Sequence, residues 1–254
     1  MATPPTTKRQ RLDLALVARG LCESREQAKR YIMAGQVDVN AQRAAKPSDL
    51  VDAGDELTLR EPEKYVSRGG FKLEHALAHF GVEPVNKVAV DLGASTGGFT
   101  DCLLQHGATK VYAVDVGRGQ LAWALRRDRR VVVMERTNAR HLRREHFPSD
   151  FAGADLVTID CSFISLKKIL PPAIAILRRP GTILALVKPQ FEAGKAEADK
   201  GRGVITDPTV HRRVLDELQA FTATEPRVRW RDATASPLQG PAGNTEFLAH
   251  IETK

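Results

Sequence analysis

The feature that most constrains the fold is a regular alternation of strand and helix patterns from about residue 88 to the end of the chain. Strand patterns, most of them short apolar runs, occur at 88–90, 110–114, 131–134, 155–159, 183–187, 227–232 and 246–251. Helical patterns fit between them at 99–106, 119–127, 166–177 and 208–221. Because strands that alternate with helices pair in parallel and are covered on both faces, we predict an α/β domain with a mostly parallel, seven-stranded sheet.

The first 60 residues follow a different pattern. Residues 1–7 are polar and rich in Pro and Thr, which predicts a flexible tail. Two short helices that stop at Gly20 and Gly35, followed by short strands, predict a small α+β domain over 8–60. The run Glu61-Pro62-Glu63 breaks the pattern, so we expect a linker at 61–66 and the larger domain at 67–254. Residues 189–206 lack periodicity, which predicts a mobile functional loop or a disordered one.

Charge and cysteine content narrow the function classes. The formal net charge is +7, which favours a polyanionic partner. The three cysteines form no CxxC pair, so we expect neither a disulfide framework nor a zinc ribbon, and favour the reducing cytoplasm. The first residues lack the apolar run of a signal peptide, and the longest apolar run, at 182–187, is too short to cross a membrane.

A glycine-rich segment at 91–100 follows an apolar strand pattern and opens a helix pattern. Glycines allow a ligand to approach the backbone, and a helix N-terminus offers amide donors. Asp115 ends the next strand, where a carboxylate can accept both hydroxyls of a ribose. A tight turn without a ligand and an Asp that caps a helix remain alternatives, but together the two features favour a nucleoside-containing cofactor.

Ionisable residues also follow other strands directly. Asp91, Asp115, Asp160 and Lys188 each end an apolar strand pattern. Because ligands of open parallel sheets bind beyond the carboxyl ends of the strands, we predict that these four residues border a functional site. A lysine there is either an exposed side chain that covers apolar surface or a functional amine, and the coincidence of four such residues favours the second.

These residues belong to motifs that resemble the TlyA-type ribosomal RNA 2′-O-methyltransferases, also called haemolysin-like. The motifs are Arg11-Leu-Asp, Ser24-Arg-Glu-Gln-Ala, Gly35-Gln-Val, Val66-Ser-Arg-Gly-Gly-Phe-Lys72, Asp91-Leu-Gly-Ala-Ser-Thr-Gly-Gly-Phe-Thr-Asp101, Asp160-Cys-Ser-Phe-Ile-Ser, Lys188-Pro-Gln-Phe-Glu192 and Asn244-Thr-Glu246. The resemblance implies an S4-type RNA-binding domain joined to an FtsJ/RrmJ-like, Rossmann-type domain that uses S-adenosylmethionine. It further implies 2′-O-methylation of ribosomal RNA, at cytidine, within one or both ribosomal subunits.

The resemblance also implies site residues. The catalytic Lys-Asp-Lys-Glu tetrad falls on Lys72, Asp160, Lys188 and Glu246. From the chemistry of these groups we hypothesise that Lys188 is the general base, that Asp160 and Glu246 orient it, and that Lys72 positions the ribose. The cofactor residues are Asp91, Gly93, Ala94, Ser95, Gly97, Gly98, Phe99, Asp115, Val116, Asn138 and Ala139. Among these, Asp91 and Gly93 would line the methionine end, Asp115 the ribose, and Asn138 with Ala139 the adenine. The family linker can read Arg-x-Trp-Val, whereas this chain has Glu63-Lys-Tyr-Val66.

Basic residues are the predicted RNA contacts, because guanidinium groups suit phosphates. They are Lys8, Arg9, Arg11, Arg19, Arg25, Lys29, Arg30 and Arg68. A second basic cluster is Arg126, Arg127, Arg129, Arg130, Arg136, Arg140, Arg143 and Arg144. Few aromatic residues accompany them, which favours recognition of folded RNA over base stacking.

Other readings of the sequence stay open but carry less weight. We expect no metal site, because His75 and His79 have zinc-pair spacing without the glutamate of HExxH or a third ligand. Cys161 has no identifiable histidine partner and is expected to be a structural thiol. Alternative functions are base methylation, a non-catalytic ribosome-assembly factor and a membrane-active haemolysin. We expect no membrane partner and favour a monomer.

Overall fold

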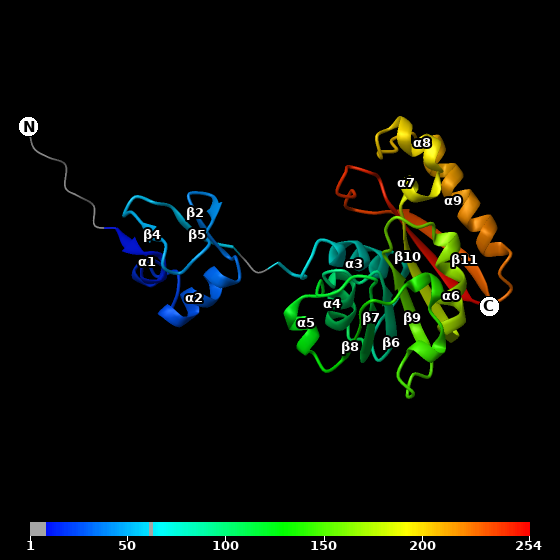
Figure 1. The fold of residues 1–254 in the computed structure, drawn as a ribbon, viewed down its shortest axis with the longest axis horizontal. Helices are drawn as coiled ribbons and strands as arrows, with labels where there is room; N and C mark the ends of the chain where they lie inside the picture. Colours follow the sequence, from blue (N-terminus) through cyan, green and yellow to red (C-terminus); the bar gives the residue numbers. More distant parts are fainter. Residues whose placement is uncertain (1–8, 61–62) are drawn as a thin grey trace, which may run out of the picture. The chain divides into compact units, whose positions relative to one another are not determined.

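The computed structural model describes residues 9–60 and 63–254, and the chain divides into two compact units, Met1–Lys64 and Tyr65–Lys254 (Figure 1). The predicted tail at 1–7, Lys8 and the first two linker residues lie outside the described residues. Within the described residues, none of the helices is long and apolar enough to cross a membrane.

The first unit packs two helices against short strands. The helices are α1 (Leu12–Ala18) and α2 (Arg25–Met33), and the strands are β1 (Gln10–Arg11), β2 (Val37–Val39), β3 (Gln42–Arg43), β4 (Leu50–Val51) and β5 (Leu57–Leu59). Leu12, Leu16 and Ile32 are buried between these elements. The Ser24 hydroxyl accepts a hydrogen bond from the Gln27 amide at 3.2 Å, which caps α2 as its sequence predicts. The α+β character of this unit agrees with the prediction.

A buried carboxylate organises the start of this unit. Asp13 is fully buried, and both Arg11 and Arg25 donate hydrogen bonds to it, at 2.9 to 3.0 Å. The hydrogen bond from Arg11 is the main reason that the pKa of Asp13 falls to about 2, and Arg25 adds to it. These two arginines therefore join β1 and α2 to α1.

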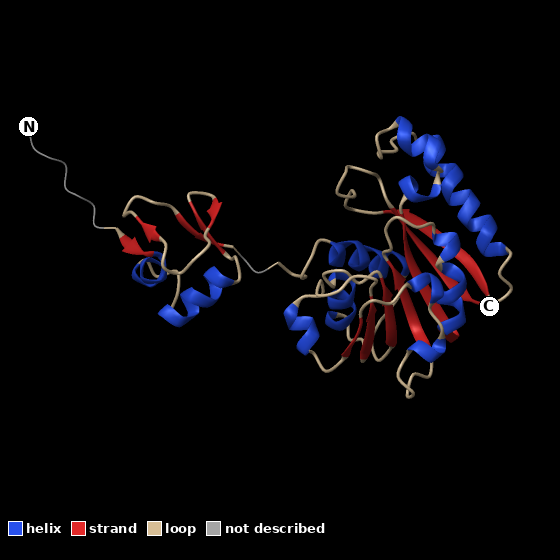
Figure 2. Ribbon diagram, viewed as in Figure 1, coloured by secondary structure: helices blue, strands red, loops and turns tan. Residues whose placement is uncertain are grey.

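The second unit is built on one seven-stranded sheet, which Figure 2 shows in red. In spatial order its strands are β11 (Val228–Ala235), β12 (Phe247–Thr253), β10 (Leu177–Val187), β9 (Ala154–Ile159), β6 (Val88–Leu92), β7 (Lys110–Val114) and β8 (Val131–Met134). β12 runs antiparallel to both of its neighbours, and β10, β9, β6, β7 and β8 are parallel. The predicted α/β class and mostly parallel sheet are confirmed.

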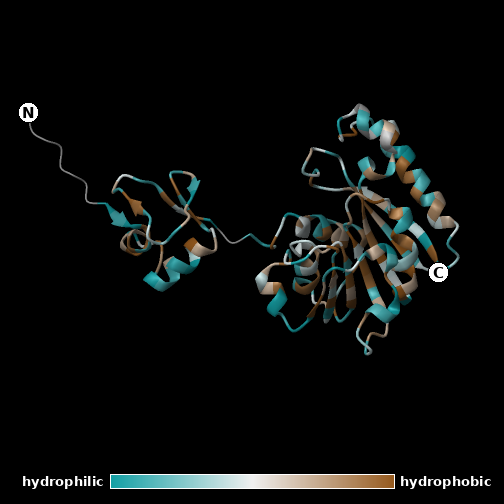
Figure 3. Cartoon of the chain, in the orientation of Figure 1, coloured by the Kyte–Doolittle hydropathy of each residue, from teal (hydrophilic) through white to brown (hydrophobic). Residues whose placement is uncertain are grey.

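Helices cover both faces of this sheet. One face carries α3 (Gly69–Phe80), α4 (Gly98–Gln105) and α5 (Trp123–Arg127), and the other carries α6 (Leu170–Ile176) and α9 (Pro208–Ala223). Side chains alternate along β6, so that Ala89 faces α3 and α4 whereas Val90 and Leu92 face the opposite core. Figure 3 shows the apolar residues, in brown, concentrated along the central strands.

Three segments differ from their sequence predictions. The segment 189–206 is not a structureless loop, because it holds α7 (Pro189–Glu192) and α8 (Lys195–Lys200). The helix predicted at 119–127 is confined to α5, since Gly119 has a φ of +73° that no right-handed helix allows. The helix predicted at 166–177 divides into η3 (Leu166–Lys168) and α6. Two further short 3₁₀ helices are η1 (Ala139–His141) and η2 (Arg144–His146).

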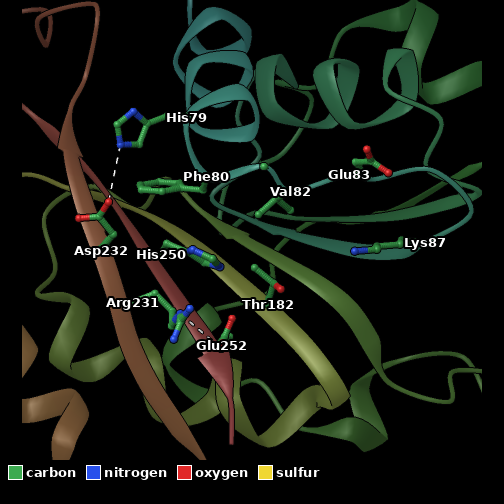
Figure 4. Close-up of a pocket in the computed structure, with 11 residues that line it drawn as sticks. His79, Phe80, Val82, Glu83, Lys87, Thr182, Arg231, Asp232, His250 and Glu252 are labelled. Carbon is green, nitrogen blue, oxygen red and sulfur yellow. Dashed lines mark ion pairs between the residues drawn. The ribbon is translucent and has the colours of Figure 1, made fainter.

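The C-terminal end of α3 borders a hollow of about 700 Å³ at the edge of the sheet where the parallel strands begin (Figure 4). Phe80 contacts His250 there with ring centroids 5.1 Å apart, and His79 lies 3.7 Å from Asp232. Burial lowers the pKa of His250, so this ring favours its neutral form against Phe80. The hollow therefore lies at the opposite end of α3 from the residues that α3 supplies to the candidate site.

We expect Asp13→Asn to destabilise the first unit by about 2 kcal/mol at pH 7, because the pKa of Asp13 is about 2 in the folded chain against an ordinary 3.8. A carboxylate with a lowered pKa stabilises fully above about pH 4, and its contribution disappears as the pH falls through 2. Urea titrations at several pH values, followed by methyl NMR signals of Leu12 and Leu16, measure the difference. Glu26→Gln removes only an exposed pair with Lys29 and serves as the control. An equal loss for both variants contradicts the prediction.

Candidate active site

The candidate site forms where three neighbouring strands meet one edge of the sheet. Asp160 directly follows β9, Lys188 directly follows β10, and Glu246 directly precedes β12. Because β12 is antiparallel, its first residue lies at the same edge as the ends of β9 and β10. Val187 pairs with Phe247, so the next residues along the two strands, Lys188 and Glu246, are neighbours at this edge.

A buried ion pair links α3 to this edge. The Lys72 ammonium donates to Glu246 Oε2 at 2.5 Å, and the two side chains are 10% and 1% exposed. A Cβ at position 240 would lie 2.5 Å from Glu246 Oε1, so the enclosed carboxylate requires glycine there. Buried Asn244, two residues earlier, donates to the Gly203 carbonyl and accepts from the Ile205 amide. The close contact at Gly240 and the two hydrogen bonds of Asn244 therefore fix the turn before β12.

A second lysine–carboxylate pair lies on the neighbouring strands. Lys188 Nζ is 2.5 Å from Asp160 Oδ1, and it donates a hydrogen bond to Ser162 Oγ at 2.8 Å. The Lys188 side chain is 10% exposed and that of Asp160 is 26% exposed, so this pair is more open to solvent than the first. The structure thus brings together all four residues of the predicted tetrad as two ion pairs.

The glycine-rich segment contacts the second pair through its backbone. Gly93 has a φ of +85°, and a Cβ there would lie 2.6 Å from the Asp160 carbonyl oxygen. The Asp160 amide in turn donates to the Leu92 carbonyl at 2.9 Å. The loop after β6 and the residue after β9 are therefore in direct backbone contact, which only a glycine at position 93 permits.

Asp91 is a buried residue that supports this loop through hydrogen bonds. It is fully buried on β6, and it accepts hydrogen bonds from Thr100 on α4 at 2.7 Å and from Thr158 on β9 at 2.9 Å. Burial raises the pKa of Asp91 to about 6, although the two threonine hydroxyls oppose this. Asp91 therefore ties a helix and two strands together at the base of the site.

Beside this loop lies a cavity of about 490 Å³. Its lining includes Gly93, Ser95, Asp115, Val116, Asn138, Ala139, Asp160 and Ser162. The other predicted cofactor residues, which are Asp91, Ala94, Gly97, Gly98 and Phe99, do not line it. Six of the eleven predicted residues thus face the cavity, and the others support the loop or pack nearby.

Asp115 is held in place at the rim of this cavity. Its two carboxylate oxygens accept hydrogen bonds from the Ser95 amide at 2.8 Å and the Gly117 amide at 2.7 Å. Each oxygen keeps a further lone pair, so the carboxylate can still accept the hydroxyls of a ribose. The acceptor oxygens of Asp115 and the position of Gly93 on the cavity wall therefore fit a nucleoside-containing cofactor.

Gly97 and Gly98 serve helix packing rather than the cavity. A Cβ at position 98 would lie 2.2 Å from Ser67 Oγ and 2.9 Å from the Gly70 amide nitrogen, which brings α4 close to the start of α3. A Cβ at position 97 would overlap the side chains of Leu121 and Leu125. The close approach that these two glycines permit is to the protein itself, and cofactor binding by them stays a prediction.

Sequence reasoning missed four residues at or near the second pair. Ser162 contacts Lys188, and Phe163 is 90% exposed at the cavity with a φ of +62°. Phe163 also lies 5.1 Å from the ring of Phe191 on α7. Glu192, on the same helix, accepts from Ser165 Oγ at 2.6 Å and from the Leu166 amide at 2.7 Å. Their only sequence signal is their place within the motifs that contain Asp160 and Lys188.

The predicted RNA contacts of the first unit are largely engaged within it. Arg19 donates to the backbone carbonyls of Asp52, Ala53 and Asp55, and Lys29 pairs with Glu26. Arg9 lies 3.4 Å from Asp52, and Arg11 and Arg25 both contact Asp13 as described above. Lys8 lies outside the described residues, and Arg30 is exposed. RNA binding by these residues stays a prediction, since most of their side chains remain partly exposed.

In the second unit, Arg68 is exposed and lies 3.4 Å from the Gln239 carbonyl. The second basic cluster contains internal ion pairs, which are Arg126 with Glu135, Arg130 with Asp128 and Arg143 with Glu145. The other arginines of this cluster, Arg127, Arg129, Arg136, Arg140 and Arg144, are exposed. Exposed basic side chains therefore flank β8 in the sequence.

Neither the histidine pair nor Cys161 offers competing chemistry. The rings of His75 and His79 stack 5.8 Å apart, and the described residues contain no group of three His, Cys, Asp or Glu that could hold a metal. Burial raises the pKa of Cys161 to about 12, so its thiol is protonated at neutral pH and is a poor nucleophile.

Comparison with known proteins agrees with this geometry. The FtsJ-like methyltransferase family profile matches residues 65–253, and the S4 domain profile matches residues 10–57. The chain belongs to the FtsJ-like methyltransferase family. Its second unit is thus the methyltransferase domain, and the first contains the S4 domain.

Relatives of similar length match nearly the whole of this methyltransferase. The 16S/23S rRNA (cytidine-2′-O)-methyltransferase TlyA of Mycobacterium tuberculosis is 44% identical over 252 residues, 97% of this chain and 91% of that protein. Hemolysin A of Brachyspira hyodysenteriae is 40% identical over 241 residues, 95% and 99% of the two chains. The solved structure of a candidate hemolysin from Streptococcus thermophilus matches with a TM-score of 0.73 and 45% identity, over 98% of this chain and 90% of that one.

We expect Asp91→Asn to remove a pH dependence of the methyltransferase domain's stability. A pKa of about 6 in the folded chain, against 3.8 ordinarily, means that folding favours the protonated form. The wild type therefore loses up to about 3 kcal/mol as the pH rises from 4 through 6, and the asparagine variant does not. Denaturant titrations at pH 4.5 and 7.5 compare the two. Parallel pH dependences for wild type and variant contradict the prediction.

We expect Gly93→Ala to destabilise the domain by more than its backbone strain alone. A left-handed alanine costs about 1 to 2 kcal/mol, and here its Cβ also meets the Asp160 carbonyl. Gly81→Ala is the matched control, because Gly81 has a φ of +65° but nothing within 4 Å of the added Cβ. The free energies of unfolding of the two variants isolate the contact. Equal losses would show that the close approach to Asp160 is unimportant.

Proposed function

We propose that this chain transfers a methyl group from S-adenosylmethionine to the 2′-hydroxyl of a cytidine ribose in ribosomal RNA. The observation that carries the proposal is the arrangement of two lysine–carboxylate pairs, Lys72 with Glu246 and Lys188 with Asp160, at the sheet edge beside the Gly93 cavity. The closely related protein named as a 16S/23S rRNA (cytidine-2′-O)-methyltransferase supports the RNA, the nucleotide and the ribose position. The S4 domain within the proposed 8–60 unit supports RNA binding, and the 67–254 unit carries the transfer.

The cavity beside the glycine loop holds the cofactor in this proposal. Asp115 accepts the ribose hydroxyls, and Asn138 and Ala139 border the adenine, since all three line the cavity. Gly93, at the end of the cavity next to Asp160, borders the methionine part. S-adenosylmethionine supplies a methyl group already activated on a sulfonium, so the protein needs only to deprotonate and orient the hydroxyl.

Lys188 is the proposed general base. A ribose 2′-hydroxyl becomes a strong nucleophile when it loses its proton, and a neutral amine within hydrogen-bond reach can accept that proton. Asp160 and Ser162, the two partners of Lys188, both line the cofactor cavity. Lys188 therefore stands next to the space where the hydroxyl meets the methyl group.

Lys72 has a different proposed role. Its partner Glu246 is 1% exposed, and neither residue lines the cofactor cavity. A charged lysine held by a buried carboxylate is a fixed donor, which can orient the ribose without exchanging a proton. Glu246 also lies next to Lys188 across the strands, so this pair positions the base from its far side.

Phe163 is the proposed platform for the target base. Its ring is 90% exposed at the cavity, beside the ring of Phe191, and nucleobases stack on exposed aromatic rings of this kind. The segment Asp160-Cys-Ser-Phe163 differs from the Asn/Asp-Pro-Pro-Tyr type of motif that many base methyltransferases use. These features favour a target ribose whose base is turned out of its RNA helix.

The proposal predicts a labelled 2′-O-methyl nucleoside when the protein is incubated with methyl-labelled S-adenosylmethionine and ribosomal subunits that lack modifications. Lys188→Ala and Asp160→Ala should lower the rate by about 100-fold or more, because general acid–base catalysis contributes on that scale. Mass analysis of digested nucleosides identifies the product and the subunit.

Lys87→Ala, at the opposite edge of the sheet, is the control lysine and should keep wild-type activity. Cofactor and RNA affinities are measured for each variant, so that loss of binding is separated from loss of chemistry. A base-methylated product would reject the ribose mechanism. Full transfer by Lys188→Ala with normal binding would reject Lys188 as the base.

A further inference from the structure

We infer that Ser162 is a positioning residue, which together with Asp160 turns the lone pair of neutral Lys188 toward the ribose hydroxyl. The inference rests on the proposed function, because it assumes that Lys188 accepts the proton. It adds a residue outside the predicted tetrad and assigns it a geometric role. The observation behind it is the pair of oxygen atoms around the Lys188 nitrogen, which makes an ion pair with Asp160 Oδ1 at 2.5 Å and a hydrogen bond to Ser162 Oγ at 2.8 Å.

The geometry of an amine explains why two acceptors matter. A neutral lysine amine has two N–H bonds and one lone pair, arranged tetrahedrally with the carbon chain. A single acceptor fixes one N–H bond and leaves the amine free to rotate, so the lone pair can point in either of two remaining directions. Two acceptors occupy both N–H bonds, and the lone pair must then take the one remaining direction. For Lys188, Ser162 Oγ accepts the hydrogen bond of one N–H group, and Asp160 Oδ1 lies 2.5 Å from the nitrogen as an ion-pair partner that occupies a second position around it.

The other lysine of the site provides a contrast. In the hydrogen bonds of the described residues, Lys72 contacts Glu246 and no hydroxyl group. Its nitrogen has no second fixed acceptor to orient a lone pair, which suits a residue that stays protonated. The hydroxyl acceptor therefore distinguishes the proposed base from the proposed fixed donor, although both lysines pair with a carboxylate.

The turn that carries Ser162 is fastened to the helix that follows Lys188. α7 begins at Pro189, directly after Lys188, and contains Phe191 and Glu192. Phe191 contacts the ring of Phe163, and Glu192 accepts hydrogen bonds from Ser165 and Leu166. Because Phe163, Ser165 and Leu166 all contact this four-residue helix, the turn holds the Ser162 hydroxyl at its distance from the Lys188 amine even though Ser162 itself is exposed.

Ser162 can be replaced without a change of charge around the amine. The charged groups at Lys188 are Asp160 on the turn after β9, and Glu246 with its partner Lys72 on the neighbouring strand and α3. Asp91 lies buried behind Asp160, and the Cys161 thiol also senses the charge of Lys188. A substitution at Ser162 removes a hydrogen bond and leaves all these groups in place.

The test compares Ser162→Ala and Ser162→Thr with the wild type at saturating S-adenosylmethionine and unmodified ribosomal subunits. We expect Ser162→Ala to lower kcat by about 10- to 100-fold, the scale of a misplaced catalytic group. KM for both substrates should stay within about twofold of wild type, because positioning acts on the transition state rather than on ground-state binding. Ser162→Thr keeps the hydroxyl and should recover most of the lost kcat.

The second measurement is the pH–rate profile, which would not shift if Ser162 had a purely structural role. Without the serine oxygen, protonated Lys188 has lost an acceptor and is less stable relative to the neutral amine. The acidic limb of the profile for Ser162→Ala should therefore lie at lower pH than in wild type. The plateau value of kcat should also be lower than in wild type. Ser162→Thr should return the limb to its wild-type position.

Each outcome bears on the inference separately from the proposed function. Unchanged kcat and pH profile in Ser162→Ala would overturn the role of Ser162, as would a raised KM with unchanged kcat, which indicates substrate binding. Failure of the wild type to form a 2′-O-methyl nucleoside would instead reject the proposed function. Ser149→Ala, at an exposed serine outside the site, controls for the substitution itself, and thermal unfolding confirms that each variant is folded.

Discussion

The buried ion pair between Lys72 and Glu246 is the interaction on which the candidate site depends. Two charges withdrawn from water are costly, and each is tolerated only while the other stays within hydrogen-bond distance. The 2.5 Å contact therefore holds the first turns of α3 against the start of β12, and Gly240 leaves the carboxylate the space it needs. Since β12 lies beside β10, the same contact fixes the surroundings of Lys188.

Much of this arrangement could be predicted from the sequence, because strand ends are visible in it. Apolar runs locate the strands, and the residues that follow them, such as Asp160 and Lys188, must meet at one edge of a parallel sheet. Lys72 and Glu246 carry no such local signal, since one lies within a helix and the other begins an antiparallel strand. They were recognised only through the family motifs.

Other features depend on contacts that sequence patterns do not record. Asp13 is buried beneath arginines two and twelve residues away, so a segment that predicts an RNA-binding cluster also contains an internal ion network. The helices α7 and α8 are too short for a periodic pattern to develop over 189–206. Ser162 is one exposed hydroxyl among many, and only its 2.8 Å contact with Lys188 distinguishes it.

The backbone contact between Gly93 and Asp160 fixes the position of the glycine-rich loop relative to Lys188, because Lys188 pairs with Asp160. A Cβ at position 93 would be 2.6 Å from the Asp160 carbonyl, so a shift of either segment toward the other is blocked by hard contact. Thr158, two residues before Asp160, is tied to Asp91 at the start of the same loop. In the proposed function, a cofactor held against Gly93 would therefore also lie next to Asp160, the residue that pairs with Lys188.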